Sequence, residues 1–220
     1  MTTPDQTPAP VSVPAVPHGV EIPPEPPEIG ARALYIAARL LAGATTFFFV
    51  AFLFAFFYLR SLNQNGKWMT AHVHPDKTVG IVIVICVVLS AVAAYIASRH
   101  MRREHRGWLI PAIISILLGL AAVVVQAIAY GSQGFGPTDG AYASVYVGWT
   151  AFFMVAVICT LYWLETQVAT ELRARRDPAH SKGDISDPDQ LIEPGLAAAS
   201  FFWGYLAAVG VVTYAVLYLV

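Results

Sequence analysis

The chain has 220 residues, of which 57% are hydrophobic and 12% are charged. A soluble domain usually carries about twice that share of charged residues, so the composition excludes an ordinary soluble protein. The formal net charge of −1 offers no strongly basic surface, and no nucleic-acid partner is expected.

The first 30 residues differ in composition from the rest of the chain. Nine of the fifteen prolines fall before residue 29, and no lysine or arginine does. Proline at this density disfavours helix, and the segment has little apolar surface to bury. Residues 1–30 are therefore predicted to form a disordered, proline-rich cytoplasmic tail, without the basic start and apolar core of a signal peptide. A docking peptide for a partner is the alternative interpretation.

Five long apolar stretches fill most of residues 31–220. Each is close to the 20 residues that a helix needs to cross a hydrocarbon core about 30 Å thick. The sequence therefore predicts an all-α polytopic membrane protein, in which one domain forms a bundle of five transmembrane helices. The predicted spans cover residues 33–59, 78–98, 108–130, 142–164 and 195–220.

Histidines are absent from all five predicted spans. The six of them lie in the tail or the loops, whereas haem or copper held within a membrane is usually ligated by imidazole. We therefore expect no cofactor, no metal and no catalytic residue in this chain. One question stays open, because the outer segment with His72, His74 and Asp76 has side chains of the types that ligate zinc or copper. A flexible loop without a fourth ligand is the other interpretation.

Basic residues cluster on one side of the predicted bundle. Four lie in the segment 99–106 and four between residues 173 and 182, whereas the loop 131–141 has none. The positive-inside rule then places both basic segments and the N-terminus in the cytoplasm. Five crossings place the C-terminus outside.

Few polar groups occur inside the spans, and no chain of acidic or histidine side chains crosses them, as a proton-coupled transporter would need. The side-chain amide of Gln126 cannot easily form its hydrogen bonds within its own helix. It is therefore expected to bond a neighbouring helix or interfacial water. Cys86 and Cys159 are expected to be small buried residues without a disulfide. Small residues permit close helix approach. The glycines predicted to pack in this way are Gly119, Gly204 and Gly210.

Motifs at the ends of several spans resemble a known family. The third span ends in Gln126-Ala-Ile-Ala-Tyr130, and the fourth begins Tyr142-Ala-Ser-Val-Tyr-Val-Gly-Trp-Thr150. Their order and spacing are similar to those of subunit III of the haem-copper oxidases, above all cytochrome c oxidase, in its five-helix bacterial form. That family has Gln-x-x-Glu-Tyr at the first site, and Tyr-Gly-Ser-x-Phe followed by Thr-Gly-x-His at the second. The positions that match the family pattern are Arg60, Gln126, Tyr130, Tyr142, Ser144, Thr150 and Trp203.

The polar interior of that family is not retained in this chain. In the family, its buried ionisable groups are implicated in lipid binding and in sustaining proton uptake by the catalytic subunit. Because the groups are replaced here, the resemblance does not carry either role to this chain. The replacements stand near Thr45 and at Ala129, Phe153, Ala156, Gly204 and Ala207.

The resemblance implies a non-catalytic component of a bacterial respiratory terminal oxidase, and a multi-pass protein of the plasma membrane. Such a chain packs against catalytic subunit I, other oxidase subunits and membrane lipids, and it supports aerobic electron transport as part of an oxidoreductase complex. Haem and copper are expected in the partner catalytic subunit. Spans three to five are expected to supply the contact surface, with Gly204 and Gly210 facing the partner. The alternatives are an accessory subunit of a nitric oxide reductase, or a small transporter or orphan membrane scaffold.

Overall fold

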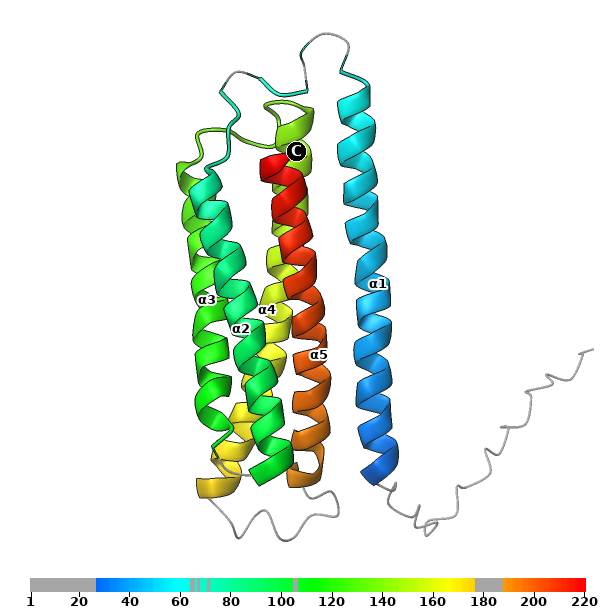
Figure 1. The fold of residues 1–220 in the computed structure, drawn as a ribbon, viewed down its shortest axis with the longest axis vertical. Helices are drawn as coiled ribbons and strands as arrows, with labels where there is room; N and C mark the ends of the chain where they lie inside the picture. The colour runs from blue at the N-terminus through cyan, green and yellow to red at the C-terminus, as the bar shows by residue number, and fades with distance from the viewer. Residues whose placement is uncertain (1–26, 64–65, 67, 71, 105–106, 177–187) are drawn as a thin grey trace, which may run out of the picture.

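The computed structural model is a bundle of helices, with no strand among the residues that it describes (Figure 1). These residues are 27–63, 66, 68–70, 72–104, 107–176 and 188–220, so most of the predicted tail lies outside them. The helices are α1 (Pro27–Ser61), α2 (Lys77–Glu104), α3 (Leu109–Ser132), α4 (Ala141–Arg176) and α5 (Pro188–Tyr214), and α5 continues into a short π-helix, η1 (Ala215–Leu219).

All five predicted spans are helices long and apolar enough to cross a membrane, which confirms the all-α fold and the number of spans. Four helices run past the predicted boundaries. Helix α1 begins at Pro27, within the predicted tail, and α5 begins at Pro188, while α2 continues to Glu104 and α4 to Arg176. The 28 residues of α2 extend about 42 Å, so its ends stand outside a core about 30 Å thick. Basic side chains occupy the last turn of α2 and of α4, where they are favourable against the helix dipole.

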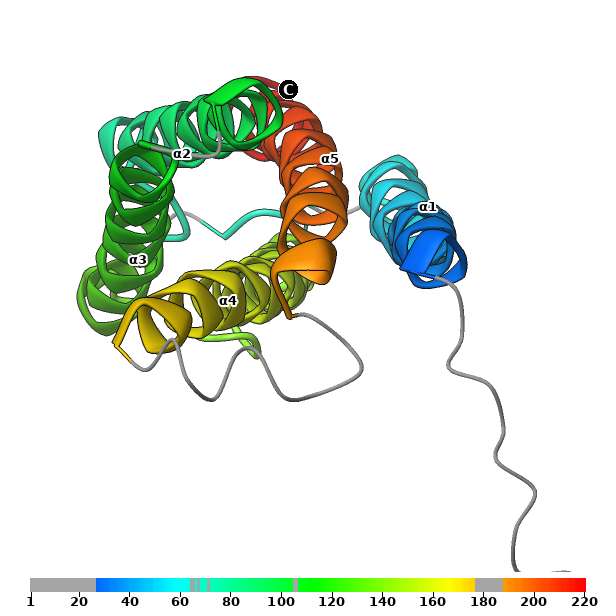
Figure 2. The same ribbon diagram turned by 90° about the horizontal axis from the view of Figure 1, so that it is seen from below.

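Four of the helices form a ring, and the fifth lies outside it (Figure 2). Within the ring, α2 packs against α3 and α5, and α4 also packs against α3 and α5. Helix α1 packs on α5 and, to a smaller extent, on α4. The hydroxyls of Thr46 and Tyr205, 2.9 Å apart, form a hydrogen bond across the contact between α1 and α5. The end of the bundle with the α1–α2 and α3–α4 loops is named the outer end, after the predicted orientation.

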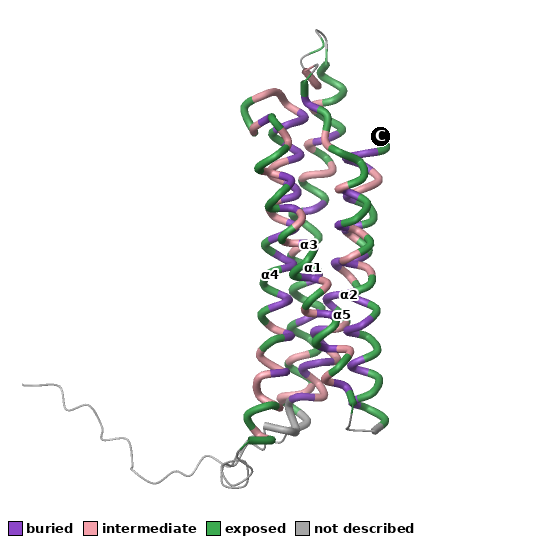
Figure 3. Tube along the Cα trace, turned by 90° about the vertical axis from the view of Figure 1, so that its left-hand side faces the viewer, coloured by how far each residue is buried: buried purple, intermediate pink, exposed green. Residues whose placement is uncertain are grey.

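The outward faces of the helices are apolar. Buried and exposed positions alternate along each helix (Figure 3), and the exposed ones include large side chains such as Phe47, Phe54 and Ile110. A surface of this kind suits hydrocarbon rather than water. Both cysteines are free, as expected. Cys86 is half-buried, but Cys159 is exposed because it falls on the outward face of α4, so the expected burial of Cys159 was wrong.

Three polar side chains join α2, α3 and α5 in the interior of the ring. Ser90 Oγ donates to the carbonyl oxygen of Ser115 (2.6 Å), and Ser115 Oγ donates to the carbonyl oxygen of Ser90 (2.8 Å). The indole Nε1 of Trp203 donates to Ser90 Oγ (2.8 Å). All three residues are buried. Because every donor in this serine–tryptophan node has an acceptor, the node links three helices without leaving a buried polar group unpaired.

A glycine makes room for the tryptophan of the node. A Cβ atom at Gly119 would lie 2.7 Å from Leu161 Cδ2 and 2.9 Å from Trp203 Cζ2. Non-bonded carbon atoms do not approach so closely, since their optimal separation is about 3.5–4.0 Å. Only glycine therefore allows α3 to come this near to the side chains of α4 and α5.

The described part of the loop between α1 and α2 lies at the outer end of the ring (Figure 1). The ring of Trp68 makes edge contacts with Phe56 (5.2 Å between centroids) and Tyr142 (5.6 Å). The carbonyl oxygen of Trp68 accepts a hydrogen bond from the backbone nitrogen of Tyr142 (3.0 Å). Thr70 Oγ1 donates to the carbonyl oxygen of Asp139 (2.9 Å). The described part of this loop is thus tied to the beginning of α4.

The substitution Gly119→Leu should destabilise the isolated chain, because the new side chain must enter space that Leu161 and Trp203 occupy. Overpacking of this kind costs about 1–3 kcal/mol. Gly204→Leu is the matched control, since a Cβ atom at Gly204 has no neighbour within 4 Å. Thermal unfolding in detergent, followed by size-exclusion chromatography, measures the difference. Equal unfolding temperatures for the two variants would contradict the close packing at Gly119.

Candidate functional site

Four of the seven positions that match the family pattern lie together in the outer half of the ring. The hydroxyl oxygens of Tyr130 and Thr150 are 2.7 Å apart, which joins α3 to α4. Thr150 Oγ1 donates its proton to the carbonyl oxygen of Tyr146 (2.7 Å), so Tyr130 is the donor in the first bond. We call the whole group the outer polar network. Its members are Gln126, Tyr130, Tyr142, Tyr146, Thr150 and Tyr218.

The same network holds the π-helix at the end of α5. The hydroxyl of Tyr142 donates to the carbonyl oxygen of Leu217 (2.6 Å). The hydroxyls of Tyr146 and Tyr218 form a second bond, with 2.8 Å between their oxygens. A π-helix is rare, and short ones are frequently found at functional sites. In η1, tyrosines of α4 supply the hydrogen bonds that fix its position.

Sequence reasoning missed Gly80, Tyr146 and Tyr218. A Cβ atom at Gly80 would lie 2.6 Å from Tyr218 Cζ, so the phenol ring packs directly on the backbone of α2. The spacing of the tyrosines along the sequence could have indicated which of them lie together. Tyr142 and Tyr146 are four residues apart, as are Tyr214 and Tyr218, and residues at this spacing share one face of a helix. Both pairs stack, with centroids 6.1 and 5.1 Å apart.

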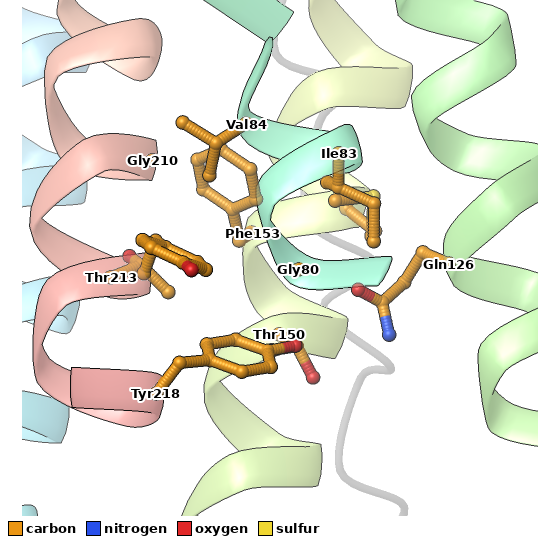
Figure 4. Close-up of a pocket in the computed structure, with 11 residues that line it drawn as sticks. Gly80, Ile83, Val84, Gln126, Thr150, Phe153, Gly210, Thr213 and Tyr218 are labelled. Atoms are coloured by element: carbon orange, nitrogen blue, oxygen red, sulfur yellow. The ribbon is translucent and has the colours of Figure 1, made fainter. Parts of the chain in front are cut away.

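Gln126 is buried in the ring, with only 2% of its surface exposed. Its side chain interacts with that of Tyr146 on α4. The amide nitrogen Nε2, however, has no hydrogen-bond partner. Figure 4 shows the amide group pointing into a small space between the helices, with the side chains of Thr150 and Tyr218 nearby.

The other three matched positions lie outside this network. Arg60 Nη1 donates to the carbonyl oxygen of Val220 (2.7 Å), which ties α1 to the end of η1. Ser144 is exposed, and its Oγ donates to the carbonyl oxygen of Gly140 (3.1 Å) at the start of α4. Trp203 belongs to the serine–tryptophan node. All three positions thus make contacts within the chain at helix ends or between helices.

The two candidate contact glycines of α5 face different ways. A Cβ atom at Gly210 would lie 3.0 Å from Phe153 Cζ, so Gly210 is packed inside the ring against α4. The expectation that Gly210 faces a partner subunit was therefore wrong, because its position falls on the inward face of α5. Gly204 is exposed and has no neighbour within 4 Å of a Cβ position, so it takes no part in packing within this chain.

Four of the positions that carry ionisable groups in the family are filled with buried hydrocarbon here. Ala129, Phe153, Ala156 and Ala207 are all buried. Phe153 also makes an edge contact with Phe49 of α1, with centroids 6.2 Å apart. Packing therefore fills these four positions. Aromatic residues aside, the buried polar residues in the described part of the chain are uncharged: Ser90, Ser98, Ser115, Gln126, Thr150, Thr160 and Thr213.

The outer segment with two histidines has other contacts. Asp76 Oδ1 accepts a hydrogen bond from the backbone nitrogen of Thr78 (2.8 Å), as a helix-capping side chain does at the start of α2. His72 Nε2 lies 4.0 Å from Asp139 Oδ2, and both side chains are partly exposed. His74 is exposed. Across the described ranges, no three His, Cys, Asp or Glu side chains are grouped to hold a metal ion.

These observations define a class of protein: a polytopic helical membrane protein whose helices are joined by hydroxyl, amide and indole groups. The chain belongs to the cytochrome c oxidase subunit III family, because residues 31–219 match the model of that family. It is similar to cytochrome c oxidase subunit 3 of Osphranter robustus, with 24% identity over 193 residues that cover 85% of this chain and 69% of that protein. The same subunit of Podospora anserina is 25% identical over 133 residues, which cover 58% of this chain and 49% of that protein.

The substitution Tyr142→Phe should destabilise the chain by about 1–3 kcal/mol, because it removes the donor to the buried carbonyl oxygen of Leu217. Tyr162→Phe is the matched control, since Tyr162 lies on the same helix with 68% of its surface exposed. Chemical unfolding in detergent, monitored by circular dichroism, compares the two variants with the parent chain. An equal loss for both tyrosines would contradict the role of the Tyr142 hydroxyl in holding η1.

Proposed function

We propose that this chain is a non-catalytic, subunit III-like component of a bacterial respiratory terminal oxidase of the cytochrome c oxidase type. It packs against the catalytic subunit, subunit I, and stabilises it during aerobic electron transport. The observation that carries this proposal is the family match, because it covers residues 31–219 and so takes in the whole ring and most of α1.

In the proposed complex, haem and copper belong to the catalytic partner. The filling of this chain's interior supports that division of roles. Haem and copper within a membrane are usually held by imidazole. The two positions where the family has histidines in its equivalent of α4 are Phe153 and Ala156 here, and both are buried in the core of the ring. The contribution of this chain is then a packed surface and a fixed arrangement of helices.

The exposed face of α5 is the proposed contact with the larger subunit. Gly204 and Ala208 are both exposed and lie four residues apart on this helix. Small residues at this spacing allow the backbone of another helix to come close, which is how helices associate where hydrocarbon already solvates large apolar side chains. Helix α5 also lies between α1 and α2 (Figure 2), so a partner helix on this face would contact more than one helix.

The substitution Gly204→Leu should lower the amount of catalytic subunit, and of its haem absorption, that is recovered with the tagged chain in mild detergent. The added side chain would hold the partner helix away from α5. Gly43→Leu is the matched control, because a Cβ atom at Gly43 of α1 also has no neighbour within 4 Å. Co-purified chains are identified by mass spectrometry, and haem by its absorption spectrum.

The possible results test the proposed function and the proposed contact face separately. If the parent chain recovers no haem-containing partner, the accessory-subunit function is wrong and a transporter or scaffold becomes the better explanation. If the parent chain recovers the partner and Gly204→Leu recovers as much, the contact lies on another face.

The proposed location is a bacterial plasma membrane, with the N-terminus and the basic helix ends in the cytoplasm, as the positive-inside rule requires. A cysteine at Thr138, which is exposed in the outer loop, should react with an impermeant thiol reagent in intact cells. A cysteine at Arg176, exposed at the other end of α4, should react only after the membrane is opened. Both are placed in a chain with Cys86→Ala and Cys159→Ala. The reverse labelling pattern would overturn this orientation.

A further inference from the structure

A small cavity with a mixed lining lies in the interior of the ring, between α2, α3, α4 and α5 (Figure 4). Its volume is about 20 Å³. Apolar side chains form much of its wall, and Gln126, Thr150, Thr213 and Tyr218 add polar groups to it. The cavity therefore lies beside the outer polar network.

Two residues that line this cavity each have a buried polar atom without a hydrogen-bond partner within the protein. These atoms are Nε2 of Gln126 and Oγ1 of Thr213. The two residues are only 2% and 6% exposed. A buried polar group without a partner costs about 1–3 kcal/mol. Because Figure 4 shows the Gln126 amide pointing into the space between the helices, its unpaired nitrogen indicates that a small polar molecule is bound there.

The size of the cavity limits what that molecule can be. A cavity of at least about 10–15 Å³ can hold one water molecule, provided that two to four polar partners surround it. The space of about 20 Å³ meets this condition. The wall also meets the second condition, since it has an amide and several hydroxyl groups.

We propose that a structural water molecule is bound in this cavity and accepts a hydrogen bond from the amide nitrogen of Gln126. Thr150 and Tyr218, which each have a hydroxyl group, line the same cavity (Figure 4). Thr150 Oγ1 already donates to Tyr146 and accepts from Tyr130, and a hydroxyl oxygen has a second lone pair. The water donates to one of these hydroxyl oxygens and so connects α3 to α4 or to η1.

Radiolytic hydroxyl-radical labelling of the full chain in detergent tests this site, because radicals formed from a bound water oxidise side chains next to it. Met154 lines the cavity, whereas Met101 lies in a second cluster of buried side chains, which includes Trp108 and Leu164. Their exposures are nearly equal, 6% and 7%. We expect Met154 to be oxidised several-fold faster than Met101 in the parent chain. Equal rates would overturn the proposal, whatever the variants show.

Two substitutions separate the bound water from general access of solvent. Gln126→Leu removes the donor, so the rate at Met154 should fall to that at Met101. Thr160→Val is the matched control, because Thr160 is buried on α4 but bonds its own helix through the carbonyl oxygen of Ala156. This variant should leave Met154 unchanged. If Met154 is oxidised as fast in Gln126→Leu as in the parent chain, the proposal is wrong. An experimental map that resolves ordered waters but has no peak within about 3.2 Å of the Gln126 amide would also overturn it.

Discussion

The bundle depends on the bonds among Ser90, Ser115 and Trp203. In hydrocarbon the hydrophobic effect does not drive helices together, so close packing and hydrogen bonds must do so. Here each serine donates to the backbone of the other helix, and the indole adds a third helix to the pair. The indole can reach the serine only because Gly119 leaves space for its ring. The position of α5 against α2 and α3 is thereby fixed, and the outer polar network is built on that position.

The second set of bonds fixes the outer end without using charge. Tyrosines of α3, α4 and η1 bond a threonine hydroxyl, a backbone carbonyl oxygen and each other. Hydroxyl groups can be buried in this way at low cost once they are paired, whereas ionised groups demand a partner and further hydrogen bonds. This chain has the helical frame of subunit III, and Phe153 and Ala156 lie in its core. Paired hydroxyl groups and apolar packing therefore hold its helices together. The replacement of ionisable groups by hydrocarbon agrees with a structural role in a larger complex.

The spans could be predicted from sequence because length and hydropathy are properties of each segment alone. The site could be predicted only in part, because a hydrogen bond depends on two segments. Tyr146 and Tyr218 are 72 residues apart, and neither has a local pattern that names the other as its partner. Gly204 and Gly210 lie on the same helix, but the six residues between their positions turn them to different faces of it. The turn of the helix likewise decides that Cys159 falls on the outward face of α4. The histidines of the outer loop suggested a metal site by type, yet the backbone directs Asp76 to the start of α2 instead.

The placement of α1 outside the ring has a consequence for how the bundle is made. Of the five helices, α1 is translated first, but its neighbours in the finished fold are α5 and α4. Helix α2 likewise has α5 beside it, although more than eighty residues separate them in the chain. Helices α1 and α2 therefore stay in the membrane without their contacts to α5 until the ribosome has synthesised α5. Contacts between distant segments form late and leave intermediates with unpaired surfaces. Assembly of this protein is thus most exposed to error during the interval between the insertion of α2 and the arrival of α5.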